Sequence, residues 1–594
     1  MIGFLPVSKA DMKEAGLEIL DFIFITGSAY VDHPSFDAAL ISRLLSAHGY
    51  SVGIIAQPNL EKNEDFTRLS KPRLGFLISS GNLDSSLRLY TSEHHRRHFD
   101  EYSPGGKIGR LPNNAVICYT KKIKEIFPET PAIIGGIEAS LRRLTHYDYW
   151  EDRLRESILI ESGADILVYG MGEKAILEIA AELHRGVPIN ALQDIKGTAI
   201  KVPCFDYIYD YVKLPSYEDC LKNKKNFALQ EKINYMEQNP FLGKRLAQKV
   251  KDAVVAVNPP ALPLTTEEMD EVYNLPFMRT YHPMYEKQGG VPAIEEVRFS
   301  ITAHRGCFGG CNFCAIHYHE GRIIQKRSDD SILSEAKLLS ELPNFKGYIH
   351  DVGGPTANFH RPSCEGQFER GACKGKSCIN CKNLKADHSE YITLLRKMRA
   401  ISKIKKVFIR SGVRYDYLLK AKDGDKFLDE LAKYHISGQL KIAPEHISDS
   451  VLKAMGKSPK TFYTKFIEKF TKVNERIKKK QYLVPYFMSS HPGATLKDAI
   501  ELAVFLKKHN YKIRQVQDFI PTPGTISTAM YYTGINPLTG EKIYVAKTKK
   551  EKAMQRALLQ YWDKRNYALV KKALMSEKRT DLIQFLYNNA KNSL

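Results

Sequence analysis

The sequence lacks a long hydrophobic run. Across 594 residues, 43% hydrophobic and 26% charged, no stretch approaches the ~20 apolar residues that a membrane span needs. The first residues also show no positively charged region followed by a sustained apolar core. We therefore expect a cytoplasmic protein that does not bind a membrane, with about two or three globular domains for this length.

Cysteine is also scarce, and it is unevenly placed. The chain has 10 cysteines, seven of them between Cys307 and Cys381. Disulfide frameworks are typical of small secreted chains, whereas this clustering in a long chain favours metal binding in a reducing compartment. The other three, Cys118, Cys204 and Cys220, have no partner at metal-ligand spacing and are expected to be packed.

Acidic residues are too few to balance the basic ones. The formal net charge is +21 and the pI is about 9.2. Such an excess attracts polyanions, so RNA or the ribosome is a candidate partner. A solvated lysine-rich surface explains the same excess without any partner, because charge alone reports attraction that is independent of sequence.

Three of the cysteines share one glycine-rich loop. Cys307, Cys311 and Cys314 lie within eight residues, directly after a strand-like run at 297–302. The glycines beside them let the backbone turn tightly enough to aim several sulfur atoms at one point. A structural zinc site normally has four ligands, whereas a cubane held by three cysteines leaves one iron open to a small chelating molecule. The loop therefore predicts a catalytic iron–sulfur site.

The first third of the chain alternates between apolar strands and helices. A strand at 22–26, a helix at 35–48 and a strand at 51–56 form one βαβ unit. Further apolar strands are predicted at 74–79, 132–135 and 164–169. Because strands that alternate with helices form parallel sheets, we predict an α/β fold with a doubly wound, Rossmann-like N-terminal domain.

The second half continues as a strand–helix series. Six strands are predicted at 297–302, 347–352, 406–410, 439–443, 482–488 and 514–520. Such units form a partial βα barrel, whose site lies at the carboxyl ends of its strands.

Small or polar residues follow these strands: Gly353, Gly354, Ser411, Arg414 and Glu445. We interpret them as ligand-binding residues. Arg414 is the predicted carboxylate partner, because a guanidinium can pair with a carboxylate bidentately.

The Cys-x3-Cys-x2-Cys spacing, with the aromatic Phe313 before the last cysteine, resembles the signature of the radical S-adenosylmethionine (SAM) superfamily. The resemblance implies a [4Fe-4S] cluster on Cys307, Cys311 and Cys314, SAM on the open iron, and Phe313 against the adenine. It also implies reductive cleavage of SAM to a 5′-deoxyadenosyl radical, chemistry that the cofactor carries and the protein orients. The Gly353-Gly354 turn resembles the turn whose carbonyls receive the SAM amino group.

Three longer stretches, 350–358, 441–446 and 519–528, closely resemble the YgiQ family of radical SAM proteins, and the match covers nearly the whole chain. Parts of the last two are also similar to the radical SAM methylthiotransferases of tRNA and ribosomal protein. The resemblance implies fold, cluster and SAM, and a reducing electron donor such as flavodoxin or ferredoxin. The substrate stays unknown, with modification of tRNA or a ribosomal component as one hypothesis.

The N-terminal domain, notably residues 164–173, resembles cobalamin-binding-type Rossmann domains. The family's cobalt ligand comes from an Asp-x-His-x-x-Gly loop. Here Asp32 and His33 are adjacent and no glycine follows at the right distance. We therefore expect a substrate-recognition or structural role rather than cobalamin binding. Cobalamin-dependent chemistry on a small molecule is kept as an alternative, and so is a non-enzymatic iron–sulfur protein that binds RNA or acts as a scaffold.

A second cysteine group comprises Cys364, Cys373, Cys378 and Cys381. Four thiols with short spacers could form a closed zinc site or hold an auxiliary iron–sulfur cluster. Elsewhere, the basic and aromatic stretch at 142–153, beginning with Arg142 and Arg143, is a weaker candidate for gripping phosphate.

These patterns predict four parts of the chain. Residues 1–204 form the Rossmann-like domain, 205–290 a connecting segment, 291–535 the radical SAM barrel with a cysteine-rich insertion at 360–385, and 536–594 a basic helical tail.

Overall fold

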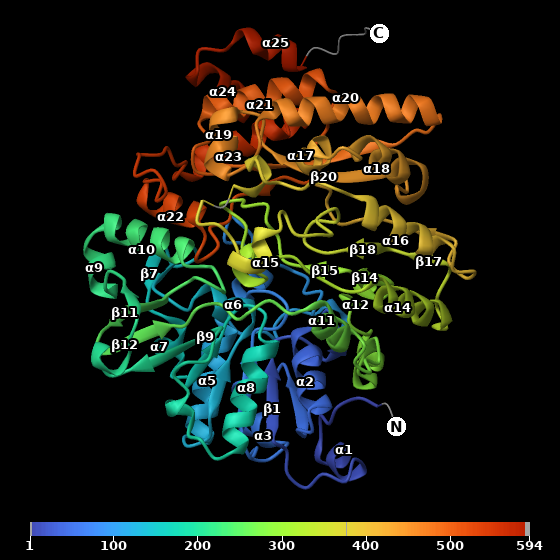
Figure 1. Cartoon of the computed structure of the whole chain (residues 1–594). Helices are drawn as coiled ribbons and strands as arrows, with labels where there is room; N and C mark the ends of the chain where they lie inside the picture. The colour runs from blue at the N-terminus through green and yellow to red at the C-terminus, as the bar shows by residue number, and fades with distance from the viewer. Residues whose placement is uncertain (1–2, 376, 588–594) are drawn as a thin grey trace.

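The computed structural model describes residues 3–375 and 377–587 (Figure 1). It is an α/β structure in which a large sheet, blue to green in Figure 1, lies below a yellow-to-orange barrel. Helices of the C-terminal region cover the far side of the barrel. The predicted fold class is confirmed by this arrangement. Within the described residues, no helix combines the length and apolarity needed to span a membrane.

Five parallel strands form one half of the N-terminal sheet. They are β1 (Phe22–Thr26), β3 (Val52–Ala56), β4 (Gly75–Ser79), β5 (Ala132–Ile134) and β8 (Ile166–Val168). Their order is β8-β5-β4-β1-β3, and almost every residue in them is buried. These strands are continuous apolar runs in the sequence because both of their faces are buried. The predicted strands are therefore confirmed to within two residues at each end.

Helices cover both faces of these strands. On one face, α2 (Asp37–Ala47) and α8 (Glu173–His184) pack on alternate strand residues such as Phe24 and Leu77. On the other, α5 (Ala115–Ile126) packs on the intervening residues such as Ile25 and Ile78. The period of two along each strand thus divides its side chains between two cores.

The segment at 205–290 is not a simple connector, and this part of the prediction is corrected. After β9 (Thr198–Val202), strands β10 (Tyr211–Lys213), β11 (Arg245–Val250) and β12 (Ala253–Val257) join the same sheet in the order β10-β11-β12-β9-β8. Here β8, β9, β12 and β11 pair in antiparallel fashion. The buried residues of β11 and β12 add to both cores of the sheet, which a linker would not do.

The predicted six strand regions of the barrel are all present. They contain β14 (Ser300–Thr302), β17 (Tyr348–Ile349), β18 (Asp351–Gly353), β19 (Lys406–Val407), β20 (Gln439–Glu445), β21 (Tyr482–Ser489) and β22 (Gln517–Asp518). The pairs β14–β18, β17–β19, β20–β21 and β21–β22 are all parallel. The first strand is shorter than predicted, because α12 (Ile294–Val297) occupies its expected beginning.

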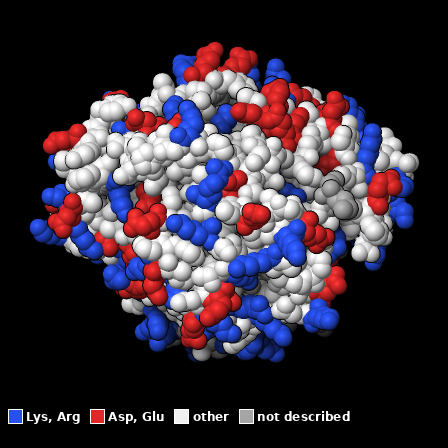
Figure 2. All heavy atoms as spheres, turned by 90° about the horizontal axis from the view of Figure 1, so that it is seen from below, with Lys and Arg blue, Asp and Glu red and all other residues white. Residues whose placement is uncertain are grey.

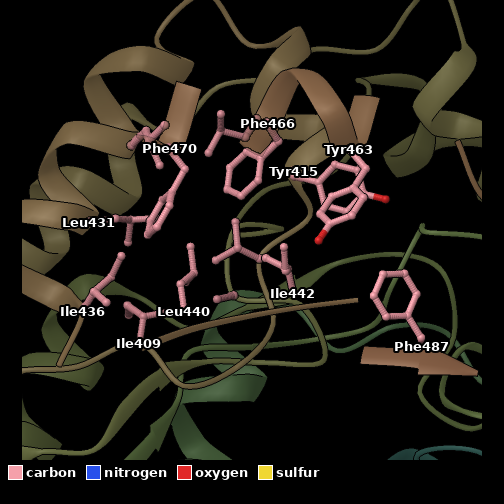
Figure 3. Packing of buried hydrophobic residues seen from close by; sticks show 14 of the residues in the cluster. Ile409, Tyr415, Leu431, Ile436, Leu440, Ile442, Tyr463, Phe466, Phe470 and Phe487 are labelled. Carbon is pink, nitrogen blue, oxygen red and sulfur yellow. The ribbon is translucent and has the colours of Figure 1, made fainter. Parts of the chain in front are cut away.

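The barrel core lies between these strands and the surrounding helices. Its outer helices include α14 (Asp329–Glu341), α16 (Ser389–Arg399), α20 (Lys460–Ile477) and α21 (Leu496–Lys508). Tyr463, Phe466 and Phe470 repeat at helical spacing along α20, and Figure 3 shows them beside Leu440 and Ile442 of β20. This apolar stripe holds the helix on the sheet.

The basic tail docks on the barrel, as its pattern of apolar residues predicts. It contains α23 (Lys549–Leu559), α24 (Tyr567–Ser576) and α25 (Asp581–Tyr587), and α22 (Ile526–Thr533) precedes it. Helix α23 packs on α21 and buries Ala557, Leu558 and Leu559. Lys549 and Lys550 of α23 are exposed, whereas Lys552 donates to Tyr531 OH at 2.8 Å. On the face seen in Figure 2, Lys and Arg are interspersed with Asp and Glu, so the excess charge is not gathered there.

We expect Phe466→Ala to lower the free energy of unfolding of the barrel by about 3–5 kcal/mol, because the substitution leaves a cavity in a fully buried site. Phe368→Ala, at a side chain that is 64% exposed, is the matched control and should change it by less than about 0.5 kcal/mol. Urea denaturation followed by circular dichroism measures both. Equal effects would contradict the packing of α20.

Candidate active site

The cysteine loop begins where β15 (His304–Arg305) pairs with β16 (Gln325–Lys326) in a short antiparallel ribbon. Gly306 follows at φ +86°, and a side chain there would collide with the carbonyl oxygen of Ile323. Its amide donates to the carboxylate of Glu320 at 3.0 Å. The ribbon and this glycine therefore close the loop at its base and leave the cysteines at the turn.

The three thiols of the loop are half-buried and interact with one another. Burial raises the pKa of Cys307 and of Cys314, and the neighbouring Cys311 thiol raises both further. Three such thiolates are unfavourable without a nearby positive charge, and a metal centre provides that charge. The donor set therefore fits a cationic cluster.

The number of thiols bears on the kind of metal. A closed structural zinc site takes four protein ligands, whereas an iron–sulfur cubane can be held by three cysteines. The three thiols of the loop therefore fit a cluster.

The middle of the loop is tied to the barrel through Asn312. Its amide donates to Met455 O at 2.9 Å, and its side-chain amide donates to Ala454 O at 2.9 Å, both at the end of α19 (Asp449–Met455). Its carbonyl accepts from the amide of Ser527 on α22 at 3.0 Å. These bonds hold Cys311 and Cys314 against the barrel.

The ring of Phe313 lies among residues that follow the last strands of the barrel. Its ring lies edge-on to His491, with 5.9 Å between centroids, in the segment after β21. His491 is buried and lies 2.7 Å from the hydroxyl of Ser527 through Nε2. Phe313 also packs in the cluster of Met488 and Phe519. Its predicted place against an adenine stays a prediction.

The structure brings Gly353, Gly354 and Ser411 together at the ends of neighbouring strands. A Cβ on Gly353 would lie 2.8 Å from Ser411 Oγ, and one on Gly354 would collide with the carbonyl oxygen of His304. Ser411 Oγ bonds the carboxylate of Asp351. These neighbours can approach so closely only because both residues are glycine.

Arg414 is already engaged, which changes its predicted role. Its Nε and Nη2 donate to the two carboxylate oxygens of Asp416 at 2.9 and 2.7 Å. Asp416 also accepts from Ser458 Oγ at 2.7 Å. Burial acts to raise the pKa of Asp416, but these partners hold that pKa well below its usual range. The two guanidinium nitrogens of Arg414 that were predicted to bind a ligand carboxylate are therefore already paired with Asp416.

The remaining nitrogen of Arg414 faces the cysteine loop. Nη1 lies 3.6 Å from Cys311 Sγ, and the guanidinium stacks over Phe359. Thr356 Oγ1 lies 3.9 Å from Cys307 Sγ. Donors to a ligating sulfur adjust the reduction potential of a cluster. Sequence reasoning missed this role because no local pattern connects residue 414 with residue 311.

Glu445 has two signs of a ligand site. It lies at the end of β20 with φ +67°, where the register with β21 shifts, although it is not glycine. Its side chain is buried, and Oε2 has no hydrogen-bond partner among the described residues. Burial raises the pKa of Glu445, although the positive charges of Lys457 and Arg414 act to lower it. Strain and an unsatisfied buried oxygen are typical of functional positions.

A cavity of about 1030 Å³ separates the N-terminal sheet from the barrel. Turns at the carboxyl edge of the sheet line one side, including Gly81, Gly135, Gly136, Gly170 and Gly172. Gly353, Gly354, Ser411 and Lys441 line the barrel side. Phe313, Arg414, Glu445 and the three cysteines do not line it. Open α/β sheets bind ligands at this edge.

One arm of the cavity reaches between the sheet and its helices. Phe24, Leu77 and Ile133 of the strands line it, together with Leu40 of α2 and Ile176 of α8. Asp37 at the start of α2 lines it as well, with its buried Oδ2 unpartnered among the described residues. His33 does not line the cavity, and its Nδ1 accepts from the amide of Ser35. In the sequence, the glycine pair at 135–136 is the one local feature that could have indicated this part of the cavity.

The weaker phosphate-binding candidates lie in the interior. Arg142 forms a buried ion pair with Asp84, and Arg143 donates to Asn234 Oδ1 at 3.0 Å. Both side chains are almost fully buried. They hold loops of the N-terminal domain together, so the expectation that they grip phosphate groups is corrected.

A buried ion pair joins the two halves of the molecule beside the cysteine loop. Arg305 pairs with Glu173, the first residue of α8, and its Nε donates to Tyr273 OH at 3.0 Å. Each charged side chain is about 95% buried or more. The base of the cysteine loop is thereby fixed against the edge of the N-terminal sheet.

Comparison with known families covers almost the whole chain. Residues 4–300 match the family described as Radical SAM N-terminal, residues 301–506 the Radical SAM superfamily, and residues 514–589 a domain of unknown function, DUF3362. A UPF0313 protein of Clostridium botulinum is 56% identical over 585 residues, 98% of this chain and 90% of its own. A UPF0313 protein of Clostridium perfringens is 51% identical over 584 residues, 98% and 88% of the two chains.

Among solved structures, the cobalamin-dependent SAM radical enzyme OxsB with aqua-cobalamin bound aligns with a TM-score of 0.51. The alignment covers 97% of this chain and 74% of that enzyme, at 10% sequence identity. At this identity the likeness concerns the fold, which pairs a sheet domain with a radical SAM barrel in one chain.

We expect Glu173→Gln to lower the free energy of unfolding by about 3–5 kcal/mol, because it leaves Arg305 buried without a countercharge. Glu182→Gln on the same helix is the control, since its surface pair with Arg185 contributes at most about 1 kcal/mol. Chemical denaturation measures both. A Glu173→Gln protein as stable as the control would show that the pair does not hold the halves together.

Proposed function

The chain belongs to the UPF0313 family of YgiQ-type radical SAM enzymes, and on that premise we propose that Cys307, Cys311 and Cys314 hold the catalytic [4Fe-4S] cluster. When bound, the cluster supplies the electron that cleaves SAM reductively to methionine and a 5′-deoxyadenosyl radical. The observation that carries this proposal is the meeting of the cysteine loop with Arg414 and Thr356 at the carboxyl ends of the barrel strands.

The chain's own residues would orient SAM on several sides. The open backbone at Gly353 and Gly354 would receive the amino group, and Phe313 would lie along the adenine. Ser411 and Glu445 would bind polar groups of the ligand, Glu445 through its unpartnered Oε2. Arg414 would act on the cluster rather than on the carboxylate of SAM, because its fork is held by Asp416.

We expect anaerobically reconstituted protein to produce 5′-deoxyadenosine with dithionite, and the variant Cys307→Ala, Cys311→Ala, Cys314→Ala to fall to background. The reason is that the three alanine substitutions remove all three thiolates that are proposed to hold the cluster. Chromatography of the nucleoside products and iron counting measure the two quantities. A reconstituted wild type that holds its cluster but never cleaves SAM would overturn the proposed activity.

We expect Glu445→Gln to raise the KM for SAM about tenfold, because a neutral amide in place of the carboxylate weakens a charge-assisted hydrogen bond to the ligand by about 1.5 kcal/mol. Glu468→Gln, an exposed change on the outer helix α20, is the matched control and should leave KM unchanged. Initial rates of 5′-deoxyadenosine formation at varied SAM concentrations give KM. An unchanged KM in Glu445→Gln would remove Glu445 from the SAM site.

The cavity favours a second, cobalamin-dependent version of this function. Its volume of about 1030 Å³ exceeds the upper end of the range, about 1,000 Å³, that is usual for small-molecule pockets. The glycine-lined edge would receive a large planar ligand, and the apolar arm would receive an attached aromatic base. His33 lies outside the lining, so the cobalt would have no histidine from the loop where the family motif places one.

We expect purified protein to bind hydroxocobalamin with a characteristic shift of its visible absorption. Ser35→Trp should weaken binding about tenfold or more, because the exposed Ser35 lines the cavity and a tryptophan would narrow it. Ser46→Trp, exposed near the other end of α2 and outside the lining, is the matched control. If no cobalamin binds while SAM cleavage is intact, the cobalamin-dependent version is excluded and the cavity is left as a substrate-binding site.

A further inference from the structure

The second cysteine group lies in an insertion between β18 and α16 that folds onto the N-terminal half. Asn239, just beyond α10 (Lys224–Met236), donates through its side chain to the carbonyls of Arg370 at 2.7 Å and Ala372 at 3.0 Å. Gly371 between them has φ +68°, and a side chain there would collide with Asn239. The insertion is therefore held in place at the junction of the two halves.

Backbone bonds bring the distant cysteines of this insertion together. The amide of Lys385 donates to Ser363 O at 2.8 Å, which places Cys364 near the end of the insertion. The amide of Cys381 donates to Cys378 O at 3.0 Å in one tight turn. The amide of Asn383 lies 3.4 Å from Cys381 Sγ, the kind of N–H···S contact that supports a ligating thiolate.

Three of the four cysteines border one hollow. Cys364, Cys373 and Cys381 line a cavity of about 900 Å³ between the insertion and the chain after α10. Cys373 and Cys381 are exposed. Two thiols of the group are therefore open to solvent at the protein surface.

The fourth cysteine faces the catalytic loop. Cys378 and Cys307 pack against the same buried group of Phe308, Phe359 and Tyr417. Phe308 and Phe359 are stacked with 3.8 Å between centroids, and Phe359 lies 5.2 Å from Tyr417 edge-on. One aromatic group thus spans the space between the two sets of thiols.

We propose that Cys364, Cys373, Cys378 and Cys381 hold a second iron–sulfur cluster that passes electrons from the protein surface to the catalytic cluster. This inference rests on the proposed radical SAM function. The transfer forms and breaks no covalent bond. One electron enters from a low-potential flavin or iron–sulfur protein, reduces the second cluster, and leaves it oxidised again when the catalytic cluster is reduced.

The test compares iron content and two reductants. Because each cubane holds four irons, we expect about eight irons in reconstituted wild type and about four in Cys373→Ser/Cys381→Ser. These two thiols are exposed, so the double variant should fold. Cys204→Ser, at an exposed cysteine far from both groups in sequence, is the matched control and should retain about eight.

The two reductants separate this inference from the proposed function. With dithionite, a small molecule that can reach the catalytic cluster directly, the double variant should still cleave SAM. With a reduced ferredoxin-type protein, its rate should fall about tenfold or more, equivalent to at least about 1.4 kcal/mol in the barrier. The Cys307→Ala, Cys311→Ala, Cys314→Ala variant should keep about four irons while losing SAM cleavage.

Three results would overturn the inference while SAM cleavage persists. About four irons in wild type, unchanged in the double variant, or one zinc ion in place of the second set of irons, would exclude the cluster. Equal rates of wild type and double variant with the protein reductant would exclude the electron relay. Failure of wild type itself to cleave SAM with either reductant would instead count against the proposed function.

Discussion

The buried ion pair between Arg305 and Glu173 is the contact on which the arrangement of this molecule depends. Arg305 precedes Cys307 by two residues, and Glu173 begins α8 of the N-terminal domain. A carboxylate at a helix N-terminus is stabilised by the helix dipole, so the pair is favourable on both sides. Neither charge can be exposed to water without separating the halves. The pair therefore keeps the cysteine loop and the carboxyl edge of the sheet in one relative position.

A second group of charges extends this junction. Glu335 of α14 accepts from both Arg279 and Arg327, and the guanidinium of Arg327 lies over the ring of Tyr273, as that of Arg305 does. Three arginines from different parts of the chain thus share two carboxylates and one aromatic ring. Buried charges are tolerated when every partner is present, and they specify one relative position of the packed elements. The large cavity lies directly beside this junction and takes its shape from it.

The site itself is built from backbone that ordinary residues avoid. Gly306 turns the chain into the cysteine loop, Gly353 and Gly354 leave no room for a side chain, and Glu445 carries a positive φ without being glycine. Such positions cost folding free energy, so the surrounding core must supply it. The aromatic packing of α20 on β20, the strand that ends at Glu445, is where the barrel does so. Rigid strands then hold the atoms of the proposed site at fixed distances.

The sequence by itself determined the features that depend on neighbouring residues. The spacing of Cys307, Cys311 and Cys314 predicted a cluster-binding loop, and runs of apolar residues located the strands of both domains, because side-chain period and turn residues act locally. Only the tertiary structure decided which groups are partners. It placed Arg414 on Asp416 and Cys311, buried Arg142 against Asp84, and added β11 and β12 to the sheet. Pairing over such distances in the chain depends on how whole elements pack, and no local pattern encodes it.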